Sequence, residues 1–314
     1  MIVNPVLKSA EFIHNIFDAM KKTHYDTSKW KEHPLNPKEC NASTVDWIFL
    51  VDLLNFSFWS EIDIDDTGVP HPDRYRVTFH DVGYTGYWSM VAAINRALEE
   101  GIPITTPEFF ASEERLPDKE IERIFRSDTK EQIPLLQERI RIIREAGRVL
   151  VEKFGGSFTN CISQADKSAL KLVEIVATNI SSFRDEAEFC GRKDYRVPQA
   201  LYHFRCLQYS PELLETLDRG EMLPYGSPLE VEIRGNSIWA VELIRRRILE
   251  LIQKELKERQ LHATEEDLNS PPKMMTVNAI LIDFFIWDFA KAAQLDLTLG
   301  ERPVKVHRTR SIYY

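Results

Sequence analysis

Apolar residues at helical spacing dominate this sequence, and they restrict its fold more than any other feature. The longest such stretch is residues 233–260. Its expected inner face carries Ile244, Ile248, Leu251, Ile252 and Leu256. On the outer face we expect the ion pairs Glu250/Lys254 and Glu255/Arg259, because residues four apart are neighbours on a helix.

Four shorter stretches predict further helices, and one short stretch predicts a strand. The helices are expected at residues 12–20, at 140–154 with an end at Gly155-Gly156, at 169–176 with Val173 on its apolar face, and at 280–293. Only residues 74–80 alternate like a strand, with Asp81-Val82-Gly83 as the expected turn. The fold class is therefore mainly α with a small β hairpin.

Three loops are candidate breaks in this fold, at residues 63–73, 103–117 and 262–273. None of them separates two halves of different composition. We therefore expect a single domain over residues 1–314, with room for two helical lobes.

Charge and composition exclude several classes of partner. The chain has 314 residues, and 40 Lys and Arg against 49 Asp and Glu give a net charge of −9. Duplex nucleic acid is an unexpected partner, because its binding is driven by a basic face, whereas a single nucleotide stays open. The four cysteines are scattered, and the sequence has no signal-peptide pattern and no apolar run long enough to cross a bilayer. We therefore expect a cytoplasmic protein without a membrane partner.

Common catalytic motifs are absent from the sequence. It contains no GxxxxGK[ST], GxGxxG, HExxH or GxSxG, so the usual phosphate-loop, dinucleotide, zinc-protease and hydrolase motifs have no support. Its eight histidines are dispersed, and we expect neither a metal nor a cofactor.

Two clusters mix aromatic with polar residues. The first is Asn55, Phe56, Ser57, Phe58, Trp59 and Ser60, after an apolar helix, and the second contains Tyr87 and Trp88. Aromatic faces beside amide and hydroxyl groups suit stacking on a planar base while its edge is hydrogen-bonded. The alternative is a core corner whose polar groups complete a helix end.

Two further clusters supply carboxylates. Asp194, followed by Tyr195 and Arg196, stands just before a predicted helix with Pro198 in its first turn, where the helix dipole favours an ionised carboxylate. Such an aspartate can also be only a cap. In the apolar helix that contains Trp287, Asp283 and Asp288 lie on different faces, and either a functional carboxylate or a buried ion pair explains them.

Together these clusters resemble one family, the queuosine salvage proteins, which are queuosine 5′-phosphate N-glycosylases. The matching stretches are residues 51–61, 87–89, 95–98, 101–105, 152–158, 194–199, 220–223, 230–235 and 312–314. The resemblance implies a helical fold similar to helix-hairpin-helix DNA glycosylases and release of the base queuine for reuse in tRNA modification.

The resemblance also implies roles for individual residues. Asp194 matches the catalytic aspartate, which suits stabilisation of an oxocarbenium-like state at C1′. The expected substrate-binding residues are Asn55, Phe56, Ser57, Phe58, Trp59, Tyr87, Trp88, Tyr195, Arg196, Arg234, Asp283, Trp287 and Asp288.

One segment departs from the family pattern. Family members carry an additional, lysine-bearing stretch before the aspartate, and here only residues 186–193 stand between Asp185 and Asp194. The alternative function is therefore a non-catalytic relative that binds queuine or its nucleotide, or a truncated product that lacks this segment. A DNA repair glycosylase is a third hypothesis, weakened by the absence of a basic stripe.

Overall fold

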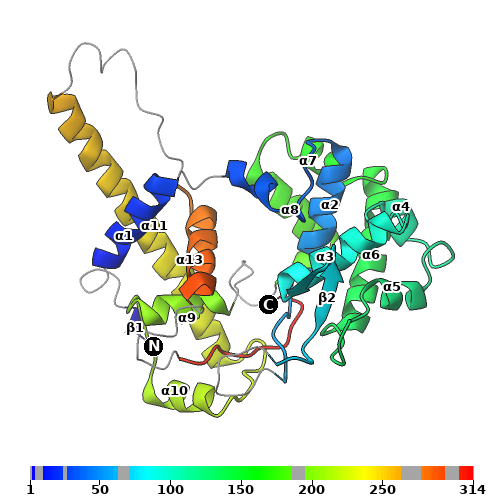
Figure 1. The fold of residues 1–314 in the computed structure, drawn as a ribbon. Helices are drawn as coiled ribbons and strands as arrows, with labels where there is room; N and C mark the ends of the chain where they lie inside the picture. Colours follow the sequence, from blue (N-terminus) through cyan, green and yellow to red (C-terminus); the bar gives the residue numbers. More distant parts are fainter. Residues whose placement is uncertain are drawn as a thin grey trace. The chain divides into compact units, whose positions relative to one another are not determined.

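The computed structural model describes residues 2–3, 10–23, 27–62, 71–185, 195–262, 277–293 and 304–313, and these are mainly helical (Figure 1). The chain forms two compact units. One, called here the 193–309 unit, contains Met1–Lys29 and Lys193–Thr309, and the other, the 30–192 unit, contains Trp30–Arg192 and Arg310–Tyr314. The boundaries coincide with none of the three loops expected as breaks.

The 30–192 unit is built around helices whose inner faces are strongly apolar. Its elements are the second half of η1 (Thr27–Glu32), which begins before the unit boundary at Trp30, and α2 (Ala42–Leu53), β2 (Arg76–Phe79), β3 (Val82–Thr85), α3 (Tyr87–Glu99), α4 (Pro107–Phe110), α5 (Asp118–Ile124), α6 (Leu136–Phe154), α7 (Phe158–Gln164), α8 (Ala169–Asn179) and η2 (Ser181–Phe183). Helix α2 is apolar on almost every side and is correspondingly buried within the core. It begins at the cap Asn41, whose side chain accepts a hydrogen bond from the Thr44 amide at 3.0 Å.

The predicted hairpin is confirmed, but its turn is one residue earlier than expected. Strands β2 and β3 are antiparallel, with Phe79 opposite Val82 and Thr78 opposite Gly83. The turn residues are His80 and Asp81, with φ of 46° and 60°. Two positive φ values are what a tight two-residue hairpin needs, so Val82 and Gly83 begin the second strand instead of forming the turn.

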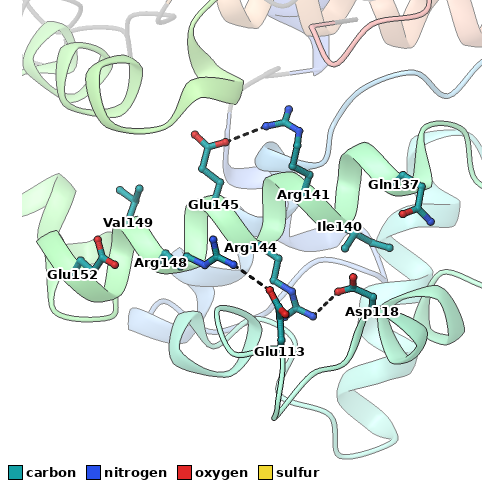
Figure 2. A pocket seen from close by; sticks show the side chains of 10 residues that line it. All are labelled: Glu113, Asp118, Gln137, Ile140, Arg141, Arg144, Glu145, Arg148, Val149 and Glu152. Atoms are coloured by element: carbon teal, nitrogen blue, oxygen red, sulfur yellow. Dashed lines mark hydrogen bonds and ion pairs between the residues drawn. The ribbon is translucent and has the colours of Figure 1, made fainter.

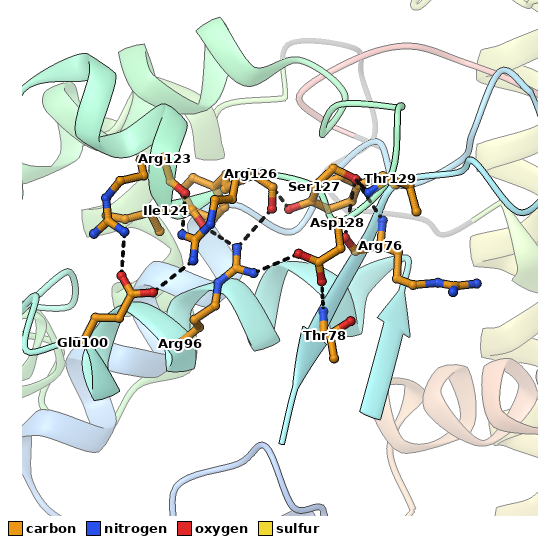
Figure 3. A network of polar contacts seen from close by, with 12 residues as sticks. Arg76, Thr78, Arg96, Glu100, Arg123, Ile124, Arg126, Ser127, Asp128 and Thr129 are labelled. Atoms are coloured by element: carbon orange, nitrogen blue, oxygen red, sulfur yellow. Dashed lines mark hydrogen bonds and ion pairs between the residues drawn. The ribbon is translucent and has the colours of Figure 1, made fainter. Parts of the chain in front are cut away.

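A network of charged groups fastens this hairpin to α3 (Figure 3). Arg96 of α3 donates to the carbonyls of Ile124 and Arg126 at 3.1 and 3.0 Å, and to Asp128 at 3.4 Å. Asp128 also accepts a hydrogen bond from the amide of Thr78 in β2. Burial opposes ionisation of Asp128, but the Thr78 bonds and the Arg96 charge outweigh it and lower the pKa of this carboxyl.

The 193–309 unit packs its helices around one long helix. Its elements are β1 (Ile2–Val3), α1 (Ala10–Thr23), α9 (Arg196–His203), β4 (Leu207–Gln208), α10 (Pro211–Asp218), α11 (Pro228–His262) and α13 (Ala279–Ala293). Helices α1, α9 and α13 each contact α11, and α9 also packs against α13 (Figure 1). Strand β1 pairs with β4 in an antiparallel sheet of two residues on each side.

The five helices expected from periodicity are confirmed as α1, α6, α8, α11 and α13. Helix α6 ends as expected, with Gly155 as its cap at φ 57°. On α11 the residues Ile244, Ile248 and Leu251 are buried, as their spacing predicted. The apolar face expected for α8 is confirmed only in part: Leu172 packs against the core, but Val173 is 60% exposed and none of that helix's residues is fully buried.

Of the two ion pairs expected along α11, Glu250/Lys254 is wrong, and the Arg259 side chain of the other pair lies outside the described residues. Glu255 pairs with Lys21 of α1 at 2.7 Å, and Glu250 accepts from Arg247 at 2.6 Å. Lys254 approaches Glu258 at 3.8 Å instead of Glu250. Across the part of the chain that the structure describes, no helix is both long enough and apolar enough to cross a membrane.

Candidate active site

The first aromatic segment, residues 55–60, follows α2 without regular secondary structure. Phe56, Ser57 and Trp59 are buried, whereas Asn55 and Phe58 are partly exposed. Ser57 adopts a left-handed backbone with φ of 51°, which is uncommon for a residue other than glycine. Contacts outside the segment must therefore hold this conformation.

A fully buried arginine of α6 provides one such set of contacts. The Cζ atom of Arg139 lies 4.2 Å from the ring centroid of Phe56 and 5.2 Å from that of Phe58. Its guanidinium donates to the carbonyl of Pro134 at 3.0 Å and to the carbonyls of Leu54 and Phe56. Arg139 therefore fixes the backbone that carries the aromatic rings. The sequence prediction missed it, although a charged residue four positions before Ile143 on an apolar helix face was a usable signal.

The second aromatic cluster joins the first. The Tyr87 ring lies edge-on to Phe58 at 6.1 Å and to Trp88 at 4.8 Å, and Trp88 stacks on His33 at 3.5 Å between centroids. These rings are partly exposed. Burial, with a smaller contribution from Asp52, raises the pKa of Tyr87, so its hydroxyl stays protonated. The structure thus groups Phe58, Tyr87 and Trp88 as rings that a planar ligand can contact.

In the 193–309 unit, the start of α9 carries two of the expected residues. Arg196 is the first residue of α9, and its Cζ lies 5.3 Å from the Tyr195 ring. The Arg196 guanidinium donates to Gln199 at 3.1 Å, and the Gln199 amide donates to the Val304 carbonyl at 2.6 Å. Asp194, expected as the catalytic carboxylate, lies outside the described residues.

The carboxylates of α13 are closer to the surface than the sequence suggested. Asp283 is partly exposed and Asp288 is exposed, while Trp287 packs against the core of the unit. Because Asp288 is exposed, it does not belong to a buried ion pair. Because α9 and α13 pack together, Tyr195, Arg196 and the α13 residues lie on adjoining helices.

Arg234 occupies a different environment, inside the core of the 193–309 unit. Its Nε lies 2.6 Å from Oε1 of Glu230, and both side chains are 0% exposed. The other Glu230 oxygen accepts a hydrogen bond from the Gly226 amide at 2.8 Å. His307 is buried nearby, and burial together with the Arg234 charge lowers the pKa of His307 to about 4.

We expect the low pKa of His307 to make folding sensitive to acid. An unfolded histidine titrates near 6.5, so between pH 6.5 and about 4 the unfolded chain binds a proton that the folded chain excludes. The stabilising contribution of the neutral ring is therefore complete above pH 6.5 and is lost as pH falls toward 4. Urea unfolding at pH 7 and pH 5 should show a smaller loss of stability in His307→Gln than in the parent. The exposed His80, changed to Gln, is the control, and equal losses in all three proteins would contradict this expectation.

A separate hollow of about 550 Å³ lies over the polar face of α6 (Figure 2). Several of its charges are paired with one another: Arg148 with Glu113 at 3.1 Å, and Arg144 with Asp118 at 2.8 Å. None of the residues expected from the sequence lines it. Among the described residues no group of three or more His, Cys, Asp or Glu side chains is placed to hold a metal ion.

Comparison with known sequences identifies the family. A family profile described as "Queuosine salvage protein" matches residues 35–193 and 193–314. The chain belongs to the queuosine salvage protein family. The match is interrupted at Lys193, which is where the sequence predicted that a family segment is missing.

Three relatives within this family are named "Queuosine 5′-phosphate N-glycosylase/hydrolase". The protein of Mus musculus is 40% identical over 323 aligned residues, covering 91% of this chain and 87% of the relative. The protein of Schizosaccharomyces pombe is 38% identical (91% and 88% covered), and that of Sphaerobacter thermophilus is 33% identical (85% and 80%). The mouse alignment exceeds the 314 residues of this chain, so it includes positions where this queuosine salvage protein has no residue.

Proposed function

We propose that this chain hydrolyses the N-glycosidic bond of queuosine 5′-phosphate and releases queuine for salvage into tRNA. The observation that carries the proposal is the 40% identity to the mouse glycosylase/hydrolase across 91% of this chain. The cluster of Phe58, Tyr87 and Trp88 supports it, because exposed ring faces suit stacking on a planar base. The reaction makes the chain an N-glycosidase, a hydrolase of N-glycosyl compounds.

The proposed chemistry breaks the C1′–N bond and forms a C1′–O bond with water, while the departing base takes up a proton. Positive charge develops on the sugar as the bond to the base lengthens. We assign Asp194 as the carboxylate that stabilises this charge or orients the water, because it matches the family's catalytic aspartate and an ionised carboxylate suits this task.

The substrate-binding residues have different proposed tasks. Phe58, Tyr87 and Trp88 stack on the base, while Asn55 supplies hydrogen bonds to its edge. Phe56, Ser57 and Trp59 are buried and support these rings from beneath. Tyr195, Arg196, Asp283, Trp287 and Asp288 are proposed to hold the rest of the substrate. Arg234 remains a candidate for binding the substrate.

The proposal also covers the architecture, the cellular location and the partners of the protein. The helical architecture is proposed to follow that of helix-hairpin-helix DNA glycosylases. The protein is proposed to act in the cytoplasm on the free nucleotide, without a cofactor and without duplex nucleic acid as a partner. The alternative of a non-catalytic binder depends on the short stretch 186–193, and the names of the relatives favour hydrolysis over it.

Incubation of the purified chain with queuosine 5′-phosphate tests the function. We expect release of queuine and ribose 5-phosphate, measured by chromatography, at the same rate with and without a chelator. Phe58→Ala should raise KM by about tenfold through loss of base stacking. Phe79→Ala is the matched control, since Phe79 is also partly buried in this unit but stacks on His80 at 4.0 Å. Tight queuine binding without turnover would favour the alternative.

A further inference from the structure

The last described residues of the chain cover the aromatic segment. Residues 304–309 belong to the 193–309 unit, but from Arg310 onward the chain belongs to the 30–192 unit. The Arg310 guanidinium lies over the Trp59 ring, with its Cζ atom 3.4 Å from the ring centroid. It donates to the Trp59 carbonyl at 3.2 Å and to Glu61 at 3.2 Å. One side chain thus holds both the ring and the backbone of Trp59.

The next residue of this tail holds Ser57. The Ser57 hydroxyl donates to the Ser311 carbonyl at 2.8 Å and accepts from the Ser311 amide at 3.3 Å. Ser57 is the residue with the left-handed backbone, a conformation that is unfavourable for a side chain with a Cβ atom and persists only where its surroundings hold it. These two backbone bonds from the tail, together with burial of the side chain, supply that constraint.

Phe58 therefore lies between two residues that the tail fixes. Its ring is partly exposed and contacts Tyr87, while Arg139 reaches its neighbour Phe56 from within the core. Beyond Trp59, the Ser60 hydroxyl donates to Glu131 at 2.8 Å. A segment without regular secondary structure presents a ring in one orientation only if such contacts restrict it, and here Ser57 and Trp59 are restricted by residues more than 240 positions away.

We propose that Arg310 is a positioning residue for hydrolysis of queuosine 5′-phosphate: by clamping Trp59 it orders the 57–59 segment, so that Phe58 is preorganised to stack on the base. This inference rests on the proposed function. Arg310 acts through Trp59 and its neighbours and not on the reacting atoms. Its loss should therefore weaken substrate binding, because part of the binding free energy is then used to order the segment. The rate of the chemical step should be almost unchanged.

The test compares Arg310→Gln, Arg310→Lys and Tyr313→Phe. Gln removes the charge and the stacking plane, whereas Lys keeps the charge toward Glu61 but loses the plane and the paired donors. Tyr313→Phe is the matched control from the same tail, because its hydroxyl donates to the Ser181 carbonyl at 3.4 Å. For each protein, kcat and KM for queuosine 5′-phosphate are measured together with amide hydrogen exchange of residues 55–61.

We expect Arg310→Gln to raise KM by about five- to tenfold, while kcat stays within about twofold of the parent. This increase in KM corresponds to the loss of one cation–π contact and one charged hydrogen bond. Amides of residues 57–61 should exchange faster, Arg310→Lys should lie between Gln and the parent, and Tyr313→Phe should match the parent. Parent-like KM and exchange in Arg310→Gln would overturn the positioning role, as would an equal change in Tyr313→Phe. A parent chain without any hydrolysis would instead overturn the proposed function.

Discussion

Replacement of Asp194 by Asn is expected to lower turnover of queuosine 5′-phosphate by about a hundredfold or more while the melting temperature stays unchanged. The substitution keeps the shape of the side chain and removes the negative charge that stabilises the oxocarbenium-like state. Asn caps helices about as well as Asp, so the capping role that the sequence left open for Asp194 would be preserved. Turnover and thermal unfolding measured on the same preparation separate catalysis from capping.

A neighbouring carboxylate and the missing segment complete this experiment. Asp185→Asn makes the same chemical change just before the shortened stretch, and we expect it to leave kcat within about twofold. Lost stability in Asp194→Asn, with proportionate turnover per folded molecule, would make Asp194 a cap only. If the parent shows no turnover, the comparison is repeated with the family's lysine-bearing segment restored between Asp185 and Asp194. Continued inactivity of that protein would count against the glycosidase function itself.

Helices were predictable here because burial of one face imposes a period on the sequence. The apolar positions of α11 and the glycine that ends α6 are local signals, and both are confirmed. Ion pairs were not predictable in this way. Glu255 pairs with Lys21 of α1, which tertiary packing brings to 2.7 Å, and the sequence of α11 carries no signal for this contact. A helical wheel contains no information about a helix that packs beside it.

Short strands and turn positions were harder for a similar reason. Strands β1 and β4 have two residues each, too few to show alternation, so no sequence pattern predicted them. At the hairpin, the turn falls on His80 and Asp81, because the register of Phe79 with Val82 leaves only these two residues to reverse the chain. The expected turn at residues 81–83 relied on a glycine that pairs in β3 instead.

The candidate site was recognisable by its aromatic residues but not by the groups that support them. Phe58, Tyr87 and Trp88 form a cluster that their composition suggested. Arg139 left only the weak signal of a charge on an apolar helix face, and Arg310 was missed because it donates to the backbone carbonyl of Trp59, a group that every residue has and that leaves no motif. Only the fold determines which carbonyls an arginine can reach.

Arg234→Met is expected to lower the free energy of unfolding by about 3–5 kcal/mol, because it leaves the Glu230 carboxylate buried without its ionic partner. Both side chains are 0% exposed and lie 2.6 Å apart within α11. Replacing both at once, as Arg234→Met with Glu230→Leu, should cost less than either single change, since no buried charge is then unpaired. Urea unfolding of the two single variants and the double variant gives the coupling energy directly.

A second pair on the same helix separates burial from pairing itself. Arg245 and Glu242 are 2.7 Å apart but partly exposed, so Arg245→Met should cost only about 0–1 kcal/mol, as for other solvent-screened pairs. If Arg234 instead contacts the substrate, Arg234→Met would fold with parent-like stability and raise KM for queuosine 5′-phosphate. A large loss of stability that the double variant partly recovers would place Arg234 among the residues that build the 193–309 unit. The match of Arg234 to the family would then be explained by stability: α11 packs against α9, whose first residue is the candidate binding residue Arg196.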